Sequence, residues 1–329
     1  MSKYLLITGG VGGARLCDGF YRSARPQDLT ILVNTGDDFE HCGLHISPDV
    51  DTLLYTLSEQ ADSKRGWGLQ NETWDTLERL GDLGGETWFQ LGDQDLATHL
   101  RRTAMLRAGS SLESVVKALA QAMGIGASVI PMSSQPLRTV IHTADEVLSF
   151  QDYFVRRRCE PVVQRVEFVG AANAQMPESL LTQMASTELE TIVICPSNPF
   201  VSVGPILAVP GLKEALARSP APVVAVSPIV GGKAIKGPAA NMLAQLAYPV
   251  SALGVARYYA DTAPGLINSL IVDNIDIELI PAIRELGIDA TATATVMHDI
   301  PERCRLASWL IEKPIAQKIA LKTDQQIQA

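Results

Sequence analysis

Four aspartates lie within fifteen residues in a stretch that glycine and proline interrupt: Asp37, Asp38, Asp49 and Asp51. Because Gly36, Gly43 and Pro48 break this stretch, it does not fit a continuous solvated helix face. Carboxylates gathered on loops at a strand end suit a hard cation such as Mg²⁺, which binds one or two of them together with substrate phosphates. The alternative is that Asp37, Asp38 and Asp49 are helix caps or turn residues.

A glycine-rich loop at residues 9–15 (GGVGGAR) follows the first apolar run. It departs from the dinucleotide-binding fingerprint because Arg15 stands where that pattern needs glycine or alanine, and it lacks the Gly-Lys-Ser/Thr of a P-loop. Glycines let the backbone approach a ligand and direct N–H groups at an anion. We therefore predict phosphate contacts from Gly10, Val11, Gly12, Gly13 and Arg15. The alternative is a tight turn without a ligand.

Two later loops, residues 196–199 (PSNP) and 227–232 (SPIVGG), also follow apolar runs. We predict that they surround a nucleotide, with contacts from Ser197, Asn198, Ser227, Gly231 and Lys233. Lys236 is a second basic candidate, because it lies in the same glycine-containing stretch.

The apolar runs that precede these loops are continuous, which is typical of strands covered on both faces in a parallel sheet. They occupy residues 4–8, 29–33, 191–195 and 222–226. Ligands bind at the carboxyl ends of such strands, so the loops should converge at one edge. The pattern predicts an α/β fold with a Rossmann-like, mostly parallel sheet and helices on both faces.

Residues 52–126 show helical patterns and no convincing strand, which predicts a helical insertion over the carboxyl edge of the sheet. Ser110 and Glu113 have the spacing of a capping box, before a helix that ends near Gly124. We expect a single α/β domain at residues 1–312, with this insertion, and a polar tail at 313–329.

Composition excludes several classes of protein. The chain has 329 residues, 47% apolar and 19% charged, which is enough to bury a full core. A net charge of −9 argues against nucleic acid as a partner, because phosphate backbones need a basic field. No apolar run is long enough to span a bilayer, and the five scattered cysteines indicate reduced thiols in a cytoplasmic protein.

Taken together, the motifs resemble the phospholactate transferase family of coenzyme F-420 biosynthesis. Seven segments occur in the order that this family shows, from the first strand to about Trp309: GGVGGAR at 9–15, NTGDD at 34–38, ISPDVDT at 46–52, GWG at 66–68, LGDQDLATH at 91–99, PSNP at 196–199 and SPIVGG at 227–232. A single motif would be weak, whereas seven in order are specific.

The resemblance implies a transfer from a guanylylated phospho-acid to the deazaflavin Fo, with release of GMP. The acid differs among members: 2-phospho-L-lactate, phosphoenolpyruvate or 3-phospho-D-glycerate. The family carries Mg²⁺ on aspartates that match Asp37 and Asp51, and the position of Asp51 also lies at the Fo site. Gln90 stands where some relatives place a basic residue at that site, and Ser133 or Ser134 stands where relatives commonly have aspartate. We also expect a homodimer.

Phosphoryl transfer depends mainly on positioning and charge neutralisation, which agrees with a glycine loop, a carboxylate-bound metal and a few lysines. Asp38 or Asp49 is expected to orient the Fo hydroxyl or to accept its proton, and the sequence leaves both open. Asp51→Asn is expected to affect folding little, because it relieves carboxylate repulsion. Gly12→Val is expected to block the diphosphate and to strain the turn if φ is positive.

Two other hypotheses remain open on the sequence alone. A nucleotide or nucleotide-sugar binding regulator of a related fold would keep the glycine loop but would not need the clustered aspartates. A nicotinamide-dependent oxidoreductase would use Asp37 or Asp38 to hold a ribose, but the missing fingerprint counts against it.

Overall fold

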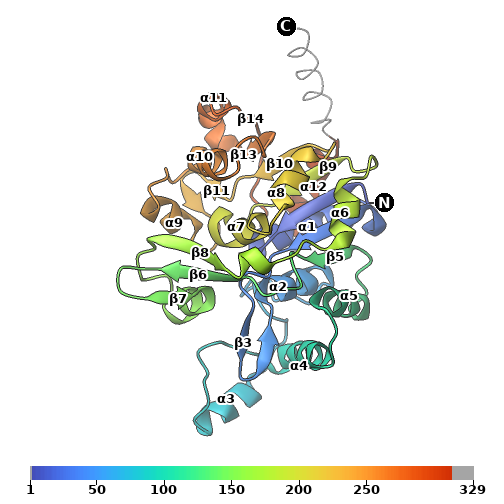
Figure 1. Ribbon diagram of the computed structural model, residues 1–329, viewed down its shortest axis with the longest axis vertical. Coiled ribbons are helices and arrows are strands. Elements are labelled where there is room, and N and C mark those ends of the chain that lie inside the picture. Colours follow the sequence, from blue (N-terminus) through green and yellow to red (C-terminus); the bar gives the residue numbers. More distant parts are fainter. Residues whose placement is uncertain (1, 313–329) are drawn as a thin grey trace.

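A computed structural model describes residues 2–312 and shows a central sheet of seven parallel strands (Figure 1). The strand order is β14-β13-β10-β9-β1-β2-β5, and every pairing in this sheet is parallel. The order reverses between β1 and β9, as in doubly wound dinucleotide-binding folds. The predicted Rossmann-like parallel sheet is therefore confirmed. Its strands are β1 (Tyr4–Thr8), β2 (Leu29–Val33), β5 (Ser128–Pro131), β9 (Thr191–Ile194), β10 (Val223–Val226), β13 (Ser269–Val272) and β14 (Asp289–Ala292).

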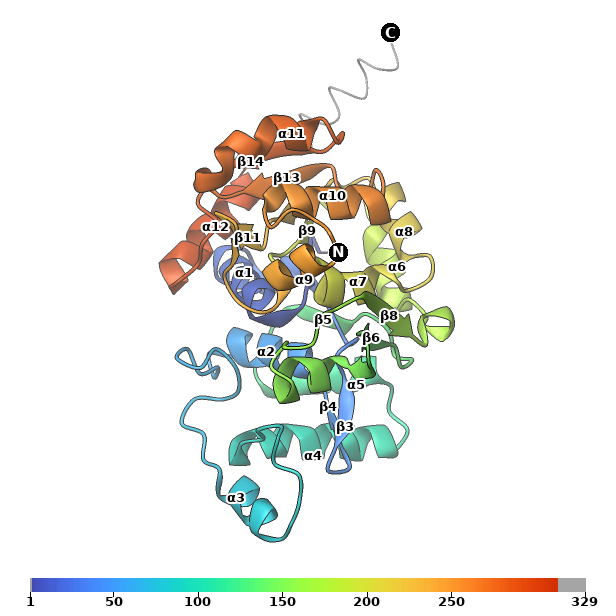
Figure 2. The same ribbon diagram turned by 90° about the vertical axis from the view of Figure 1, so that its left-hand side faces the viewer.

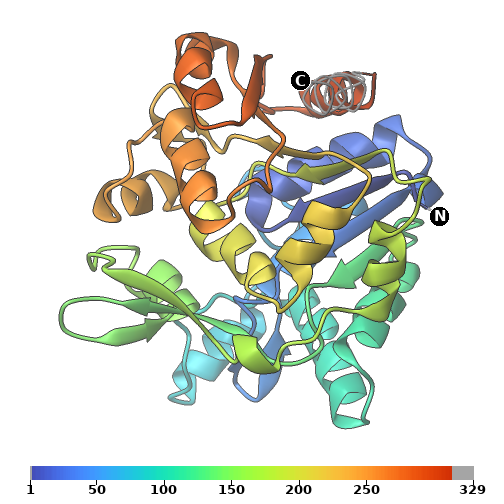
Figure 3. The same cartoon turned by 45° about the horizontal axis from the view of Figure 1, so that its top comes forward.

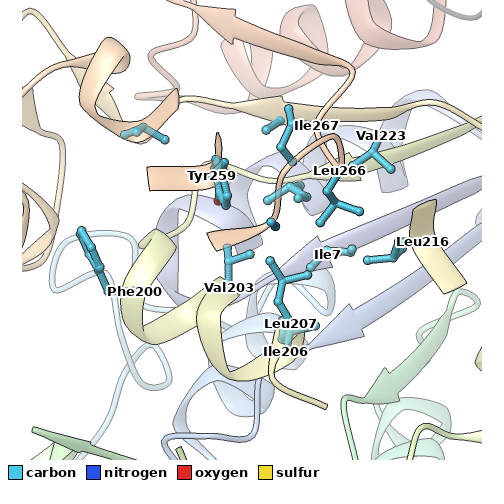
Figure 4. Packing of buried hydrophobic residues seen from close by; sticks show 14 of the residues in the cluster. Ile7, Phe200, Val203, Ile206, Leu207, Leu216, Val223, Tyr259, Leu266 and Ile267 are labelled. Carbon is cyan, nitrogen blue, oxygen red and sulfur yellow. The ribbon is translucent and has the colours of Figure 1, made fainter. Parts of the chain in front are cut away.

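Both faces of the sheet are covered, which explains the continuous apolar runs. In β1 every residue is buried, and successive side chains point to opposite faces. Leu5 and Ile7 belong to one core cluster, whereas Tyr4 and Leu6 belong to the other. Figure 4 shows Ile7 in the first cluster, with apolar side chains of neighbouring helices packed around it.

The first cluster is covered by six short or medium helices: α6 (Glu178–Met184), α7 (Gly204–Leu207), α8 (Leu212–Arg218), α9 (Ala239–Gln245), α10 (Ala252–Thr262) and α11 (Ile280–Arg284). The second is covered by α1 (Gly10–Ser23), α2 (Pro48–Leu57), α5 (Leu112–Ala122) and α12 (Ile300–Glu312). Helix α12 packs against α1 although the two lie at opposite ends of the chain (Figure 3).

Between residues 52 and 126, all of which the structure describes, the named elements are helices. They are α2, α3 (Asp75–Asp82), α4 (Asp93–Arg107) and α5. Helices α3 and α4 extend away from the central sheet (Figures 1 and 2). The predicted helix at 112–123 is confirmed as α5, but its cap differs from the prediction. Ser111 is the N-cap and accepts from the Ser114 amide, while Glu113 accepts a bond from Ser179.

Three antiparallel elements were not predicted. Strands β3 (Phe39–His41) and β4 (Leu44–Ile46) form a hairpin before α2. Strands β6 (Arg138–His142), β7 (Val147–Ser149) and β8 (Arg165–Val169) form a small sheet, and the turn at residues 150–156 (with the π-helical turn η2, Asp152–Arg156) follows β7. Strands β11 (Ile229–Val230) and β12 (Lys233–Ala234) form a second hairpin. These strands are two to five residues long. In the small sheet only Thr139, Ile141 and Leu148 are buried, so its sequence lacks the continuous apolar run that predicts a buried strand.

Among the described residues no single helix is long and apolar enough to cross a membrane. One bent pair, Pro199–Leu207 with Leu212–Arg218, passes the same test by length and composition only. All five cysteines are free, as expected. The predicted tail at 313–329 lies outside the described residues, and the division of the chain into a domain and an insertion stays a prediction.

Candidate active site

A cavity of about 640 Å³ opens at the carboxyl ends of the central strands. The glycine loop after β1 and residues 196–198 after β9 both line it. Because the strand order reverses between β1 and β9, this is the crevice in which doubly wound sheets bind ligands. The volume lies within the range of small-molecule sites.

One end of the cavity is formed by the N-terminus of α1. Gly10 has a φ of +68°, which favours glycine, and its amide donates to Asp49 at 2.8 Å. The amides of Val11 and Gly12 lie in the first turn of α1, so the helix itself offers no carbonyl to accept a hydrogen bond from them. A helix N-terminus of this kind favours anions.

Gly12 and Gly13 serve the packing of α1 against the sheet. A Cβ on Gly12 would lie 2.5 Å from the carbonyl oxygen of Pro196, and a Cβ on Gly13 would lie 2.1 Å from Oγ1 of Thr8. Neither glycine has a positive φ, so the strain considered for Gly12→Val does not arise. Substitution at Gly12 would instead push α1 away from the loop that follows β9.

Two basic side chains face this end of the cavity. The half-buried Arg15 donates to the carbonyl of Met297 at 3.0 Å, and Lys236 lies at the rim of the same cavity. Burial lowers the pKa of Arg15, with a smaller effect from Arg303. Burial, and then the charge of Arg15, lowers the pKa of Lys236. The charge of Arg15 thus disfavours the charged form of Lys236, and an anionic ligand beside the two side chains would relieve this repulsion.

Asp37, Asp38 and Asp49 form a first group of buried carboxylates. Both oxygens of Asp49 are occupied, one by the Gly10 amide and one by the side-chain amide of Asn34 at 2.9 Å. Burial raises the pKa of Asp49 to about 6. Burial also raises the pKa of Asp37, and the charges of Asp49 and Asp38 add to the shift. Oδ1 of Asp37 is buried and has no hydrogen-bond partner among the described residues.

Asp38 lies behind the cavity wall. Its Oδ2 accepts from the Ser47 hydroxyl at 2.8 Å and lies 3.0 Å from Nε2 of His45. Asp38 does not line the cavity, whereas Asp49 does. The geometry therefore favours Asp49 over Asp38 as the carboxylate that reaches a substrate.

Asp51 belongs to a second polar group, contributed by α2 and α4. Both of its oxygens are paired with the guanidinium of Arg102, which is fully buried. His99 lies between this pair and Asp95, and the Tyr55 hydroxyl donates to Asp95. Burial raises the pKa of Asp51, while the charge of Arg102 acts in the opposite direction. Asp49 and Asp51 lie in the first turn of α2, not on a loop as the sequence suggested.

The other end of the cavity is aromatic. Trp67, Trp88, Phe89, Phe150 and Phe154 line it, with Tyr55 and Gln90 beside them. Phe39 of the β3–β4 hairpin packs edge-on against Phe89, with ring centroids 4.8 Å apart. Phe150 and Phe154 are stacked at 5.4 Å. Trp67 is 40% exposed and Phe154 is 38% exposed, so large apolar side chains remain available to a flat ligand.

The structure gathers most of the predicted site residues around this cavity. Those that line it are Gly10, Val11, Gly12, Arg15, Asp37, Asp49, Asp51, Gln90, Ser197 and Asn198. Ser197 also accepts from the Gly9 amide, and Asn198 caps the turn at Pro199–Val203.

Five predicted residues do not line the cavity: Asp38, Gly13, Ser227, Gly231 and Lys233. The hydroxyl of Ser227 is turned to the backbone of Ile229, and the Gly231 amide donates to Asp276. Lys233 is exposed on the β11–β12 hairpin, while Lys236 reaches the cavity from the loop that follows.

Sequence reasoning missed Tyr55, Asp95, His99 and the aromatic wall as site residues. Asp95 and His99 have the i, i+4 spacing that places two side chains on one helix face, and this spacing was the available signal. The aromatic residues come from three separate segments, with Trp67 in the first, Trp88 and Phe89 in the second, and Phe150 and Phe154 in the third, and no local pattern connects these segments.

Asp37 fits a divalent cation, because it lines the cavity and carries a buried oxygen without a partner. Asp51 also lines the cavity, but it must share its oxygens with Arg102. An all-oxygen donor set suits Mg²⁺.

Comparison with known proteins gives a consistent picture. A family model described as 2-phospho-L-lactate transferase CofD matches residues 5–310. A 2-phospho-L-lactate transferase from Methanosarcina mazei is 38% identical over 308 residues, covering 94% of this chain and 99% of the relative. A phosphoenolpyruvate transferase from Kitasatospora aureofaciens is 39% identical over 311 residues, covering 93% and 95%. A solved structure of a UPF0052-family protein from Bacillus halodurans has a TM-score of 0.66 at 16% identity, covering 95% and 99%, which shows a shared fold.

Proposed function

The chain belongs to the 2-phospho-L-lactate transferase CofD family, and we propose that it moves a phospho-acid group from a guanosine diphosphate-type donor to the deazaflavin Fo. The bond between the acid-bearing phosphorus and the bridging oxygen breaks, the Fo hydroxyl forms the new ester bond, and GMP leaves. This is a step of coenzyme F-420 biosynthesis.

The observation that carries the proposal is the composition of the cavity wall. The part beside the glycine loop has a helix N-terminus with Arg15 and Lys236, which suit a diphosphate. Five aromatic side chains, with Arg65 over Trp67, form a second part that suits a flat tricyclic ring. The buried carboxylates Asp37, Asp49 and Asp51 line the same cavity. A donor and an acceptor of these chemical classes would therefore meet beside the carboxylates.

We place Mg²⁺ on Asp37 and Asp51, where it would neutralise charge on the transferred phosphoryl oxygens. Val11 and Gly12 direct amides toward the diphosphate, and Arg15 and Lys236 add positive charge. Asp51 and Gln90 contact Fo. Asp49 holds the Gly10 amide and so fixes the start of α1, and we assign to it the acceptance of the Fo hydroxyl proton, because its pKa is raised to about 6.

The acid is open among the three classes that the family transfers. The two relatives above carry names for two different acids at nearly equal identity, 38% and 39%. A non-catalytic nucleotide-binding regulator is not favoured, because such a protein would not need buried carboxylates in its cavity.

We further propose a cytoplasmic homodimer. The candidate contact is the exposed face of the β7-β6-β8 sheet, which carries Val147 (61% exposed) and Val169 (49% exposed) together with the charged Arg165 and Glu167. Light scattering of the purified chain tests it, and a monomer at micromolar concentration would disprove it.

The function is tested by incubating the protein with Fo, Mg²⁺ and each of the three guanylylated donors, followed by mass spectrometry of the product. We expect an Fo phosphodiester and GMP with at least one donor, and activity lost in EDTA. Thermal protection by GDP but not by ADP at equal concentration tests guanine recognition. Absence of product with all three donors would contradict the proposal.

A further inference from the structure

The group formed by Asp51, Asp95 and His99 has the composition of a metal site. Each residue offers one ligand atom, and these atoms lie within 4.8 Å of one another. All three side chains are buried and line the cavity. Nε2 of His99 is buried and lies 3.2 Å from Oδ2 of Asp95, a contact that lacks the geometry of a regular hydrogen bond.

Arg102 contacts two members of this group, Asp51 and His99. Its Nη1 lies 3.1 Å from Oδ2 of Asp51 and 3.1 Å from Nδ1 of His99, and these two acceptors are 3.7 Å apart. Its Nη2 donates to Oδ1 of Asp51. Because a guanidinium has only donors, Nδ1 of His99 must accept, which places the ring proton on Nε2, 3.2 Å from Asp95. The guanidinium thus places its positive charge beside Asp51 and Nδ1 of His99, where a cation bound by these two residues would lie.

Helix α4 builds this arrangement from one face. Asp95, His99 and Arg102 follow at i, i+4 and i+7, so their side chains lie along a single stripe. Glu72 accepts from the Gln94 amide at 2.7 Å and holds the start of the helix. Arg102 itself does not line the cavity, so it can act on a substrate only through Asp51.

The charge balance explains why an arginine is kept there. Five carboxylates are buried around the cavity: Asp37, Asp38, Asp49, Asp51 and Asp95. Arg102 is the only lysine or arginine that is buried within residues 2–312. Its charge is permanent, so it offsets part of this cluster whether or not a metal is bound.

We propose that Arg102 is a positioning residue that takes the place of a second cation: it fixes the carboxylate of Asp51 toward the cavity and prevents Asp51, Asp95 and His99 from binding a metal ion of their own. The effect that we expect of Arg102 on turnover rests on the proposed function, whereas the effect that we expect on metal binding does not.

The test compares Arg102→Met, which removes the charge at similar volume, with Arg102→Lys, which keeps a point charge but not the two parallel bonds. Arg101→Met is the matched control, because Arg101 precedes Arg102 on α4 and is exposed. Bound Mn²⁺ is counted by electron paramagnetic resonance. We expect Arg102→Met to bind one ion more than the native protein, and Arg102→Met/His99→Ala to lose that extra ion.

In turnover assays we expect kcat of Arg102→Met to fall about 100-fold, with KM for the donor within about threefold, because a misplaced group costs mainly transition-state stabilisation. Arg102→Lys should gain no ion and should recover part of kcat, and Arg101→Met should match the native protein. If Arg102→Met does not fold, Arg102→Lys decides, and native kcat in that variant would overturn the proposal.

An unchanged ion count in folded Arg102→Met would also overturn it, as would an extra ion that persists in the double variant. If the native protein makes no product with any donor, the proposed function fails, but the difference in ion count between native protein and Arg102→Met still decides the role of Arg102.

Discussion

The two ends of the cavity are held in place by different means. The phosphate end sits on β1 and β9, in which every residue is buried. The aromatic end depends largely on residues 61–90, a fully described stretch in which Leu69 is the only buried residue. Helix α3 in this stretch has no buried residue at all.

Hydrogen bonds and ring contacts hold the aromatic end instead of a core. Asp93 at the start of α4 accepts from the amides of Asp75 and Thr76 at the start of α3, and Glu72 caps α4 in return. Arg65 lies over the rings of Trp67 and Trp74, 5.3 and 5.1 Å from their centroids. Such a segment can open without disturbing the sheet, because few buried apolar contacts are lost. The phosphate end is therefore expected to be rigid, and the aromatic end adjustable.

The largest expected effects concern the carboxylates between the two ends. Asp51→Asn and Asp37→Asn should each lower kcat by about 100-fold or more, since both weaken charge neutralisation worth several kcal/mol. The structure changes the expectation that Asp51→Asn spares folding, because it leaves the buried Arg102 unpaired, at a cost of about 3–5 kcal/mol. Melting and GMP release, each with and without EDTA, measure both effects.

In the stability assay, Asp37→Asn should behave oppositely to Asp51→Asn, because it should not lower the melting temperature. The folded pKa of Asp37 is raised by burial and by neighbouring carboxylates, so its charged form opposes folding at a pH above that pKa. In EDTA at pH 8 the variant should melt no lower than the native protein, and its advantage should shrink as the pH falls. A large loss of melting temperature in Asp37→Asn, or none in Asp51→Asn, would contradict this contrast.

The next largest effect tests the phosphate end. Gly12→Val should abolish thermal protection by GDP, because its Cβ would meet the Pro196 carbonyl and shift the start of α1. Stability should also drop by about 1–3 kcal/mol, as expected for overpacking. Ala104→Val is the control, since Ala104 is exposed on α4 and lies outside the cavity wall. Normal thermal protection of Gly12→Val by GDP would show that nucleotide binding tolerates a shift of the start of α1.

A smaller effect is expected at the aromatic end. Trp88→Leu should raise KM for Fo about tenfold, which corresponds to the loss of one good aromatic contact, and should leave GDP binding unchanged. Leu83→Ala is the control, because Leu83 lies in the same segment and is 71% exposed. Equal weakening of GDP and Fo binding would mean that the two ends are coupled.

The same contrast explains what the sequence could predict. Buried parallel strands leave a strong local signal, so the ends of β1, β2, β9 and β10 were located, and with them Gly10, Asp37 and Ser197. The hairpin β11–β12 was not recognised, and this hairpin turns Lys233 away while the next loop brings Lys236 to the cavity. Arg102 gave no signal as a site residue, because its role depends on the packing of α4 against β4 and α2.

The smallest expected effect concerns the cap that holds α3. Hydrogen bonds from Thr73 and Thr76 lower the pKa of Asp93 to about 2, so Asp93 stabilises this segment above the ordinary aspartate pKa of about 4, and its contribution disappears as the pH falls through 2. Three of the four tryptophans, Trp67, Trp74 and Trp88, lie in the segment, so tryptophan fluorescence reports on it. At pH 7, Asp93→Asn should shift the fluorescence transition to lower temperature while circular dichroism of the whole fold changes little. Between pH 4 and pH 2 the native protein should converge on the variant.

Asp82→Asn, which removes only an exposed pair with Arg79 on the same helix, should have no such effect. If Asp93→Asn instead lowers the melting of the whole fold by as much as it lowers the fluorescence transition, the aromatic end is part of the same cooperative unit as the sheet, and the contrast between the two ends fails.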